Sequence, residues 1–89
     1  MAQRAVAEPA FVGALVAALT KELDGADVTV EHIRGSRYRF IVVWDKFDEM
    51  GHPERQRLVW DIAERVVPRE NLLDVGMILT MGREDLPKA

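Results

Sequence analysis

The chain has 89 residues, no cysteine, a formal net charge of −3 and a pI near 5.3. This length fits one domain, residues 1–89, and we expect its ordered part to span about residues 9–86. Without cysteine the chain forms neither disulfide bonds nor thiolate metal sites. Its acidic balance opposes bulk attraction to nucleic acid or to an anionic membrane.

The first predicted element is a helix that begins near Pro9, a residue suited to a first helical turn. Apolar residues recur at helical spacing along residues 12–23, and Gly25 can take the left-handed conformation that ends many helices. We expect residues 1–7 to form a frayed lead-in. The apolar run at residues 10–19 is too short to cross a bilayer, so we expect a soluble cytoplasmic protein with no membrane association.

Two strands are predicted next. Residues 28–33 alternate with period two, and residues 37–44 are rich in β-branched and aromatic residues. The turn between them covers only residues 34–36, so the two strands should form an antiparallel hairpin.

A second helix is predicted from Pro53 to Val67, with Pro68 as its stop signal. A third strand follows at residues 72–81, and residues 82–87 form a polar tail with one final turn. The strand–helix–strand half implies a parallel pair with a right-handed crossover. The order helix-strand-strand-helix-strand therefore predicts an α+β domain, with one mixed three-stranded sheet and both helices packed on one face.

The segment Phe47–Trp60, FDEMGHPERQRLVW, carries the most specific motif. A phenylalanine, a short loop and a helix that opens Arg-Gln-Arg-Leu-Val-Trp resemble the central signature of the BolA-like family, in which the helix opens Arg-His-Arg-Leu-Val-Tyr. Gln56 stands where the family usually has histidine. Two weaker matches follow: Thr80 falls where the family has a threonine, and the pair Glu84-Asp85 falls where it has a tail rich in proline and glutamate. The resemblance implies the BolA-like fold, whose arrangement is shared with class II KH domains.

The resemblance also implies a possible place for an iron–sulfur cluster. Members of the family use a histidine or cysteine after the first strand and a histidine at the start of the third, and share the cluster with a monothiol glutaredoxin. Here His32 lies near the first position, and Asp74 occupies the second. Because thiolate and imidazole ligands dominate such clusters, we rank an iron–sulfur or metal adaptor third and predict no cofactor.

The alternation of side chains along strands assigns them to two faces of the sheet. We expect the even-numbered residues 38–44 and the odd-numbered residues 75–81 to lie under the helices. The opposite face then has no cover from the chain itself. An aliphatic cluster there is either a surface for a partner or a few scattered side chains that need no explanation. The candidate partner-binding residues are Ile41, Val43 and Ile78, and the expected core includes Phe40, Val42, Ile62 and Leu79.

Arginines flank an aromatic residue on the hairpin, a pattern that can bind single-stranded nucleic acid. Against this interpretation, the chain is acidic and has no Gly-x-x-Gly loop of the KH type. Arg37 and Arg39 could equally form ion pairs with Glu31. The candidate nucleic-acid-binding residues are Arg34, Arg37, Tyr38 and Arg39.

Acidic residues and a histidine gather after the second strand, and such ligands suit a divalent cation. Their spacing matches no calcium loop, and the same residues are typical of a solvated turn. The weak metal-ligand candidates are His32, Asp45, Asp48 and His52.

For catalysis the sequence offers no nucleophile–base set, because its single serine, Ser36, lies in a turn. We therefore predict no enzyme. The leading hypothesis is a small interaction module that binds another protein or itself as a weak homodimer. The alternative hypothesis is a nucleic-acid-binding, KH-like domain.

Overall fold

The computed structural model describes residues 8–86, so the predicted lead-in at residues 1–7 lies outside the described residues. Five main elements follow one another along the chain: α1 (Ala10–Glu22), β1 (Asp27–Arg34), β2 (Arg37–Val43), α2 (His52–Val66) and β3 (Val75–Met81). Three short 3-10 helices lie between or after them: η1 (Asp45–Glu49), η2 (Arg69–Asp74) and η3 (Arg83–Asp85).

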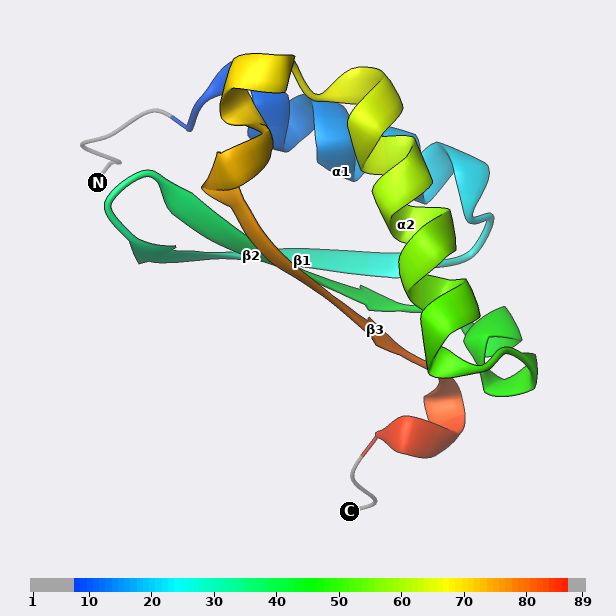
Figure 1. Ribbon diagram of the computed structural model, residues 1–89. Coiled ribbons are helices and arrows are strands. Elements are labelled where there is room, and N and C mark those ends of the chain that lie inside the picture. Colours follow the sequence, from blue (N-terminus) through cyan, green and yellow to red (C-terminus); the bar gives the residue numbers. More distant parts are fainter. Residues whose placement is uncertain (1–7, 87–89) are drawn as a thin grey trace.

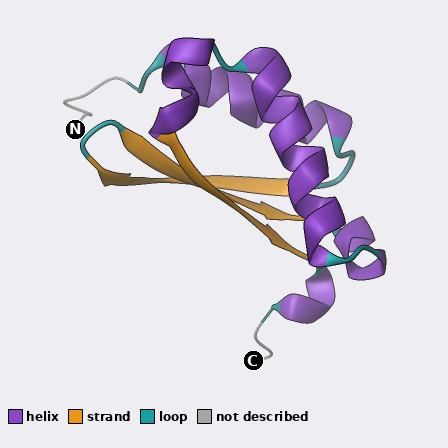
Figure 2. Ribbon diagram, viewed as in Figure 1, coloured by secondary structure: helices purple, strands orange, loops and turns teal. Residues whose placement is uncertain are grey.

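The elements form two layers, with α1 and α2 side by side on one face of a twisted sheet (Figures 1 and 2). The strand order is β1-β2-β3, in which β2 pairs antiparallel with β1 and parallel with β3. The predicted α+β architecture is therefore confirmed. The third strand begins at Val75 rather than at residue 72, because η2 occupies the preceding residues.

The hydrophobic core lies between the helices and the sheet. From β2 it contains Phe40 and Val42, which are fully buried, and from α2 it contains Val59 and Ile62. From α1 it contains the predicted apolar stripe, since Leu15 and three neighbours at helical spacing are buried. The glycine expected to end α1, Gly25, has a φ of 88° and so adopts the left-handed conformation.

The prediction for the faces of β3 was wrong by one residue. Tyr38 pairs with Val75 but Arg39 pairs with Met77, so β3 has one extra residue, Gly76, at this point. Beyond it the alternation is inverted. Ile78 is 2% exposed under the helices, whereas Leu79 is half-buried on the opposite face.

Two sequence predictions therefore need correction. Ile78 belongs to the core and is not available to a partner, and Leu79 is not a core residue. A glycine within a strand often marks a bulge or a close approach of another chain segment. Gly76 was therefore the signal in the sequence that could have revealed the inversion.

Candidate functional site

The sheet face opposite the helices has no cover from the described chain (Figures 1 and 2). The register places Ile41 beside Leu79, Val43 beside Met81, and Arg39 beside Met77. Because paired residues of neighbouring strands point to the same side, the five apolar side chains form one cluster. We call this cluster the open face, defined by Ile41, Val43, Met77, Leu79 and Met81.

Correction of the β3 register makes this surface more apolar than the sequence predicted. Ile78 leaves it, and Met77, Leu79 and Met81 join Ile41 and Val43. Met77 is 45% exposed, one of only three large hydrophobic residues in the described chain with such exposure. A second one, Ile33, extends from β1 towards this face, with its Cδ1 placed 3.4 Å from where a Cβ on Gly76 would stand.

Polar groups border the open face on the β1 side. Asp27, Thr29 and Glu31 are all exposed and pair with Val43, Ile41 and Arg39 respectively. Arg39 Nε lies 3.2 Å from Glu31 Oε1 in an ion pair, as the sequence suggested for this arginine. The patch is therefore apolar over β2 and β3, with Arg39 beside Met77 at one end, and it is polar over β1 from Asp27 to Glu31.

Arg83 of η3 lies at the end of the sheet where β1 begins and β2 ends. Its guanidinium contacts Asp45 at 2.6 Å and Asp27 at 3.4 Å. Arg83 thereby links the first residue of β1, and the η1 segment that follows β2, to the C-terminal segment. These contacts raise the pKa of Arg83, chiefly through its hydrogen bond with Asp45.

The structure separates the candidate nucleic-acid residues. Tyr38 is 8% exposed on the helix-covered face, packed edge-to-face against Phe11 with ring centroids 6.0 Å apart. Arg39 points to the opposite face, where it pairs with Glu31. Arg34 and Arg37 are exposed at the turn. Tyr38 therefore cannot serve as a stacking platform between these arginines.

The two positions that the family resemblance assigns to cluster ligands do lie at the same end of the sheet. The His32 ring stacks on Tyr38 at 4.9 Å, and its Nε2 lies 2.6 Å from Gly35 O. Ser36 Oγ donates a hydrogen bond of 2.7 Å to Asp74 Oδ1, and Asn71 Nδ2 donates one of 3.3 Å to Oδ2. Both oxygens of this carboxylate are thus engaged by neighbours.

The candidate metal ligands do not meet. His32 lies opposite Tyr38 at the start of β2, while Asp45 follows the end of that strand, roughly 23 Å away along an extended backbone. Asp45 pairs with Arg83, and Asp48 accepts a hydrogen bond of 3.2 Å from Glu84 N. His52 is exposed at the first turn of α2. Within residues 8–86 no three histidine or acidic side chains group as a metal site.

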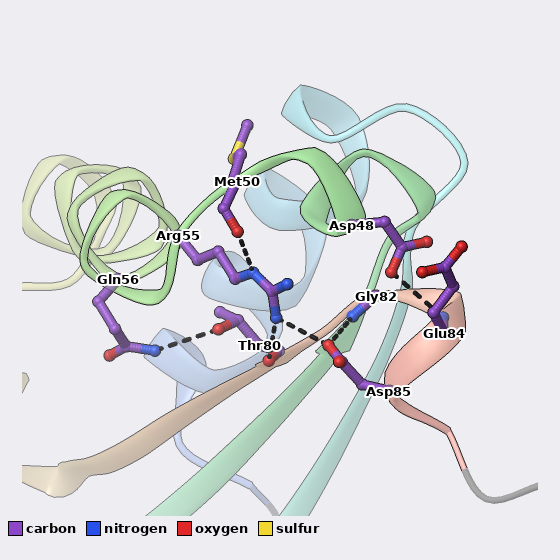
Figure 3. A network of polar contacts seen from close by, with 8 residues as sticks. All are labelled: Asp48, Met50, Arg55, Gln56, Thr80, Gly82, Glu84 and Asp85. Atoms are coloured by element: carbon purple, nitrogen blue, oxygen red, sulfur yellow. Dashed lines mark hydrogen bonds and ion pairs between the residues drawn. The ribbon is translucent and has the colours of Figure 1, made fainter.

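The motif residue Arg55 holds three segments together (Figure 3). Its Nε donates to Met50 O at 3.1 Å, and its Nη1 donates to Asp85 Oδ2 at 2.8 Å and to Thr80 O at 3.4 Å. The guanidinium also lies 5.7 Å from the centre of the buried Phe47 ring. The aromatic residue and the arginine of the motif are therefore packed partners that fix the start of α2 to β3.

Gln56 and Trp60, which stand where the family signature has histidine and tyrosine, are bonded to each other. Trp60 Nε1 donates to Gln56 Oε1 at 3.1 Å, and Gln56 Nε2 donates to Ile78 O at 2.9 Å. The carbonyls of successive residues in a strand point to opposite sides. Met81 O accepts a hydrogen bond from Trp44 N on the β2 side, so the carbonyls of Thr80 and Ile78 point away from β2. The helix thus binds the outer carbonyls of this edge strand.

Gly82 allows the loop before α2 to approach the end of β3. It is buried, and a Cβ there would lie 2.9 Å from Asp48 N and closer still to the Asp48 carboxylate. Gly82 N donates a hydrogen bond of 2.8 Å to Asp85 Oδ2, the same oxygen that accepts from Arg55 (Figure 3).

This arrangement predicts a loss of stability in acid. The hydrogen bond from Gly82 N, and then that from Arg55, lowers the pKa of Asp85. A folded-state pKa below the unfolded value, about 3.9, gives stability that is present above that value and is lost as pH falls through the folded pKa. We expect the urea midpoint to fall on acidification from about pH 5 to about pH 2, and Asp85→Asn to remove part of this fall.

Glu84→Gln, the same change of charge one residue away, serves as the control and should retain the acid dependence of the wild type. An unchanged acid dependence in Asp85→Asn would show that other carboxylates account for it.

Comparison with solved structures finds a match to BolA1 from Arabidopsis thaliana, with a TM-score of 0.68. The match covers 89% of this chain and 99% of that chain, at 17% sequence identity. The chain therefore has the BolA-like fold, and the resemblance based on Phe47–Trp60 is confirmed at the level of the fold. No family model and no curated protein matches the sequence. Within residues 8–86, no helix is long and apolar enough to cross a membrane.

Proposed function

We propose that this protein is a small non-catalytic interaction module and that the open face is its binding surface. The observation that carries the proposal is the clustering of five apolar side chains on a sheet face that no described segment covers. Contiguous exposed apolar patches bordered by polar residues mark interaction sites in soluble proteins.

The energetics favour a transient complex. Burial of apolar surface contributes about 25 cal/mol per Å², so a patch of a few hundred Å² supplies roughly several kcal/mol. The loss of translational and rotational freedom offsets much of this gain. We therefore expect micromolar rather than obligate association, either with another protein or with a second copy of this chain.

Leu79→Lys tests the proposal. The side chain lies beside Ile41 and outside the core, so the variant should keep its fold while placing a charge at the centre of the patch. We expect it to abolish both concentration-dependent self-association in sedimentation velocity and crosslinking to partners in lysate of the native cell. Circular dichroism should report an unchanged fold.

Leu73→Lys is the matched control. Leu73 is 83% exposed and lies in η2, on the helix-bearing side of the sheet (Figure 1). It should behave as the wild type in both assays. If Leu79→Lys retains every association that the wild type shows, the open face is ordinary solvated surface and the proposal is wrong.

A further inference from the structure

We propose that the occupant of the open face is an amphipathic α-helix of a partner protein, lying along β2 and β3. This inference rests on the proposed function and names the kind of structure that the surface accepts. It follows from the shape of the apolar band, its polar border and the state of the β3 edge.

The apolar band has the width of one helix. It covers two neighbouring strands, β2 and β3, whose spacing of about 4.8 Å makes a band about 10 Å wide once side chains are included. A helix with its side chains measures about 10–12 Å across. From Met77 to Met81 the band extends over roughly 13 Å, which corresponds to about nine helical residues, or two to three turns.

The β1 border opposes coverage by a second sheet. A sheet packed over all three strands would also cover Asp27, Thr29 and Glu31, which are exposed beside the apolar band. Removing carboxylates from water is unfavourable unless the new neighbours supply full pairing. A single helix over β2 and β3 leaves Asp27, Thr29 and Glu31 of β1 in contact with solvent. Arg39 lies beside Met77 at one end of the band, where it keeps its ion pair with Glu31.

The size of the patch also opposes a dimer of two copies. Five partly exposed side chains offer a few hundred Å² per partner, below the roughly 800 Å² per partner of a stable interface between folded proteins. A helix with apolar residues at positions i, i+4 and i+7 matches the smaller area.

The β3 edge is already occupied, so an added strand is disfavoured there. The outward carbonyls of Ile78 and Thr80 accept hydrogen bonds from Gln56 and Arg55. A partner strand at this edge would have to displace both side chains. Helix docking on the face needs no backbone hydrogen bond, and the unbranched thioethers of Met77 and Met81 adapt to different apolar neighbours.

The test is a selection from two display libraries of equal size against the whole protein. One library presents amphipathic helices of about three turns with randomised apolar positions, and the other presents β-hairpins. We expect helical binders to be enriched and to shift the Met77 and Met81 methyl resonances. Leu79→Lys should weaken them roughly 30-fold or more, as expected for a central interface residue. Leu73→Lys should leave their affinity unchanged.

The other outcomes separate the two proposals. Enrichment of hairpins alone, with sensitivity to Leu79→Lys, would overturn the helix inference and leave the open face as the binding surface. If the wild type self-associates, Leu79→Lys does not, and no helical binder is enriched, the helix inference is again wrong. The open face then remains the binding surface, and a second copy of the chain is its occupant. Binders indifferent to Leu79→Lys, or no binder and no self-association, would overturn both proposals. Ile41→Lys replaces Leu79→Lys should the latter not fold.

Discussion

Replacing Phe40 with alanine is expected to lower the free energy of unfolding by about 3–5 kcal/mol, a large part of the stability of a domain this small. Phe40 is fully buried near the middle of β2, beneath the helices. The change removes one of the two largest fully buried side chains of the core, and the helices above cannot collapse fully into the space. Urea denaturation followed by circular dichroism measures the loss.

The matched control is the next residue of the same strand. Ile41 points to the open face, so Ile41→Ala should cost about 1 kcal/mol or less. The same comparison tests the corrected face of β3, since Ile78→Ala should cost far more than Leu79→Ala. Equal losses within either pair would show that the sheet faces are assigned wrongly.

Arg55→Ala is expected to destabilise the fold by about 2–4 kcal/mol, because it leaves the partly buried carbonyls of Met50 and Thr80 without a donor. Its side chain is 14% exposed and also packs over the ring of Phe47. Arg57, two residues along the same helix, is exposed, and Arg57→Ala should change stability by about 0.5 kcal/mol or less.

Amide hydrogen exchange would show where the structure loosens in Arg55→Ala. Protection should fall first in the Gly82–Asp85 turn and in η1, the two segments that this arginine ties to α2. A loss of stability spread evenly over the sheet, with these segments still protected, would contradict this role of the network.

The motif therefore has a structural explanation in this protein. Phe47 and Arg55 pack together, and Gln56 and Trp60 form a hydrogen-bonded pair that reaches the edge of β3. The spacing of these residues in the sequence could indicate the fold, because the buried Phe47 and the start of α2 must lie a fixed number of residues apart to pack together. It could not indicate that their side chains bind the backbone of a strand more than twenty residues further on.

The sequence by itself determined the order of the elements, the hairpin and the core face of β2. Each of these depends on local periodicity, turn residues or a continuous β-branched run, all of which act between residues near one another in the chain. It also indicated correctly that both helices would pack on one face of the sheet, which leaves the other face without cover from residues 8–86 (Figure 1).

Only the tertiary structure decided which residues of β3 line that face. Strict alternation from Val75 placed Leu79 inside and Ile78 outside, but the extra residue at Gly76 inverts the pattern when β3 pairs with β2. For Tyr38 the sequence predicted the face under the helices, but only the tertiary structure shows that its ring contacts Phe11 and His32. Register and contacts between distant segments depend on the whole packing of sheet and helices, so a one-residue shift moves a side chain from solvent to core.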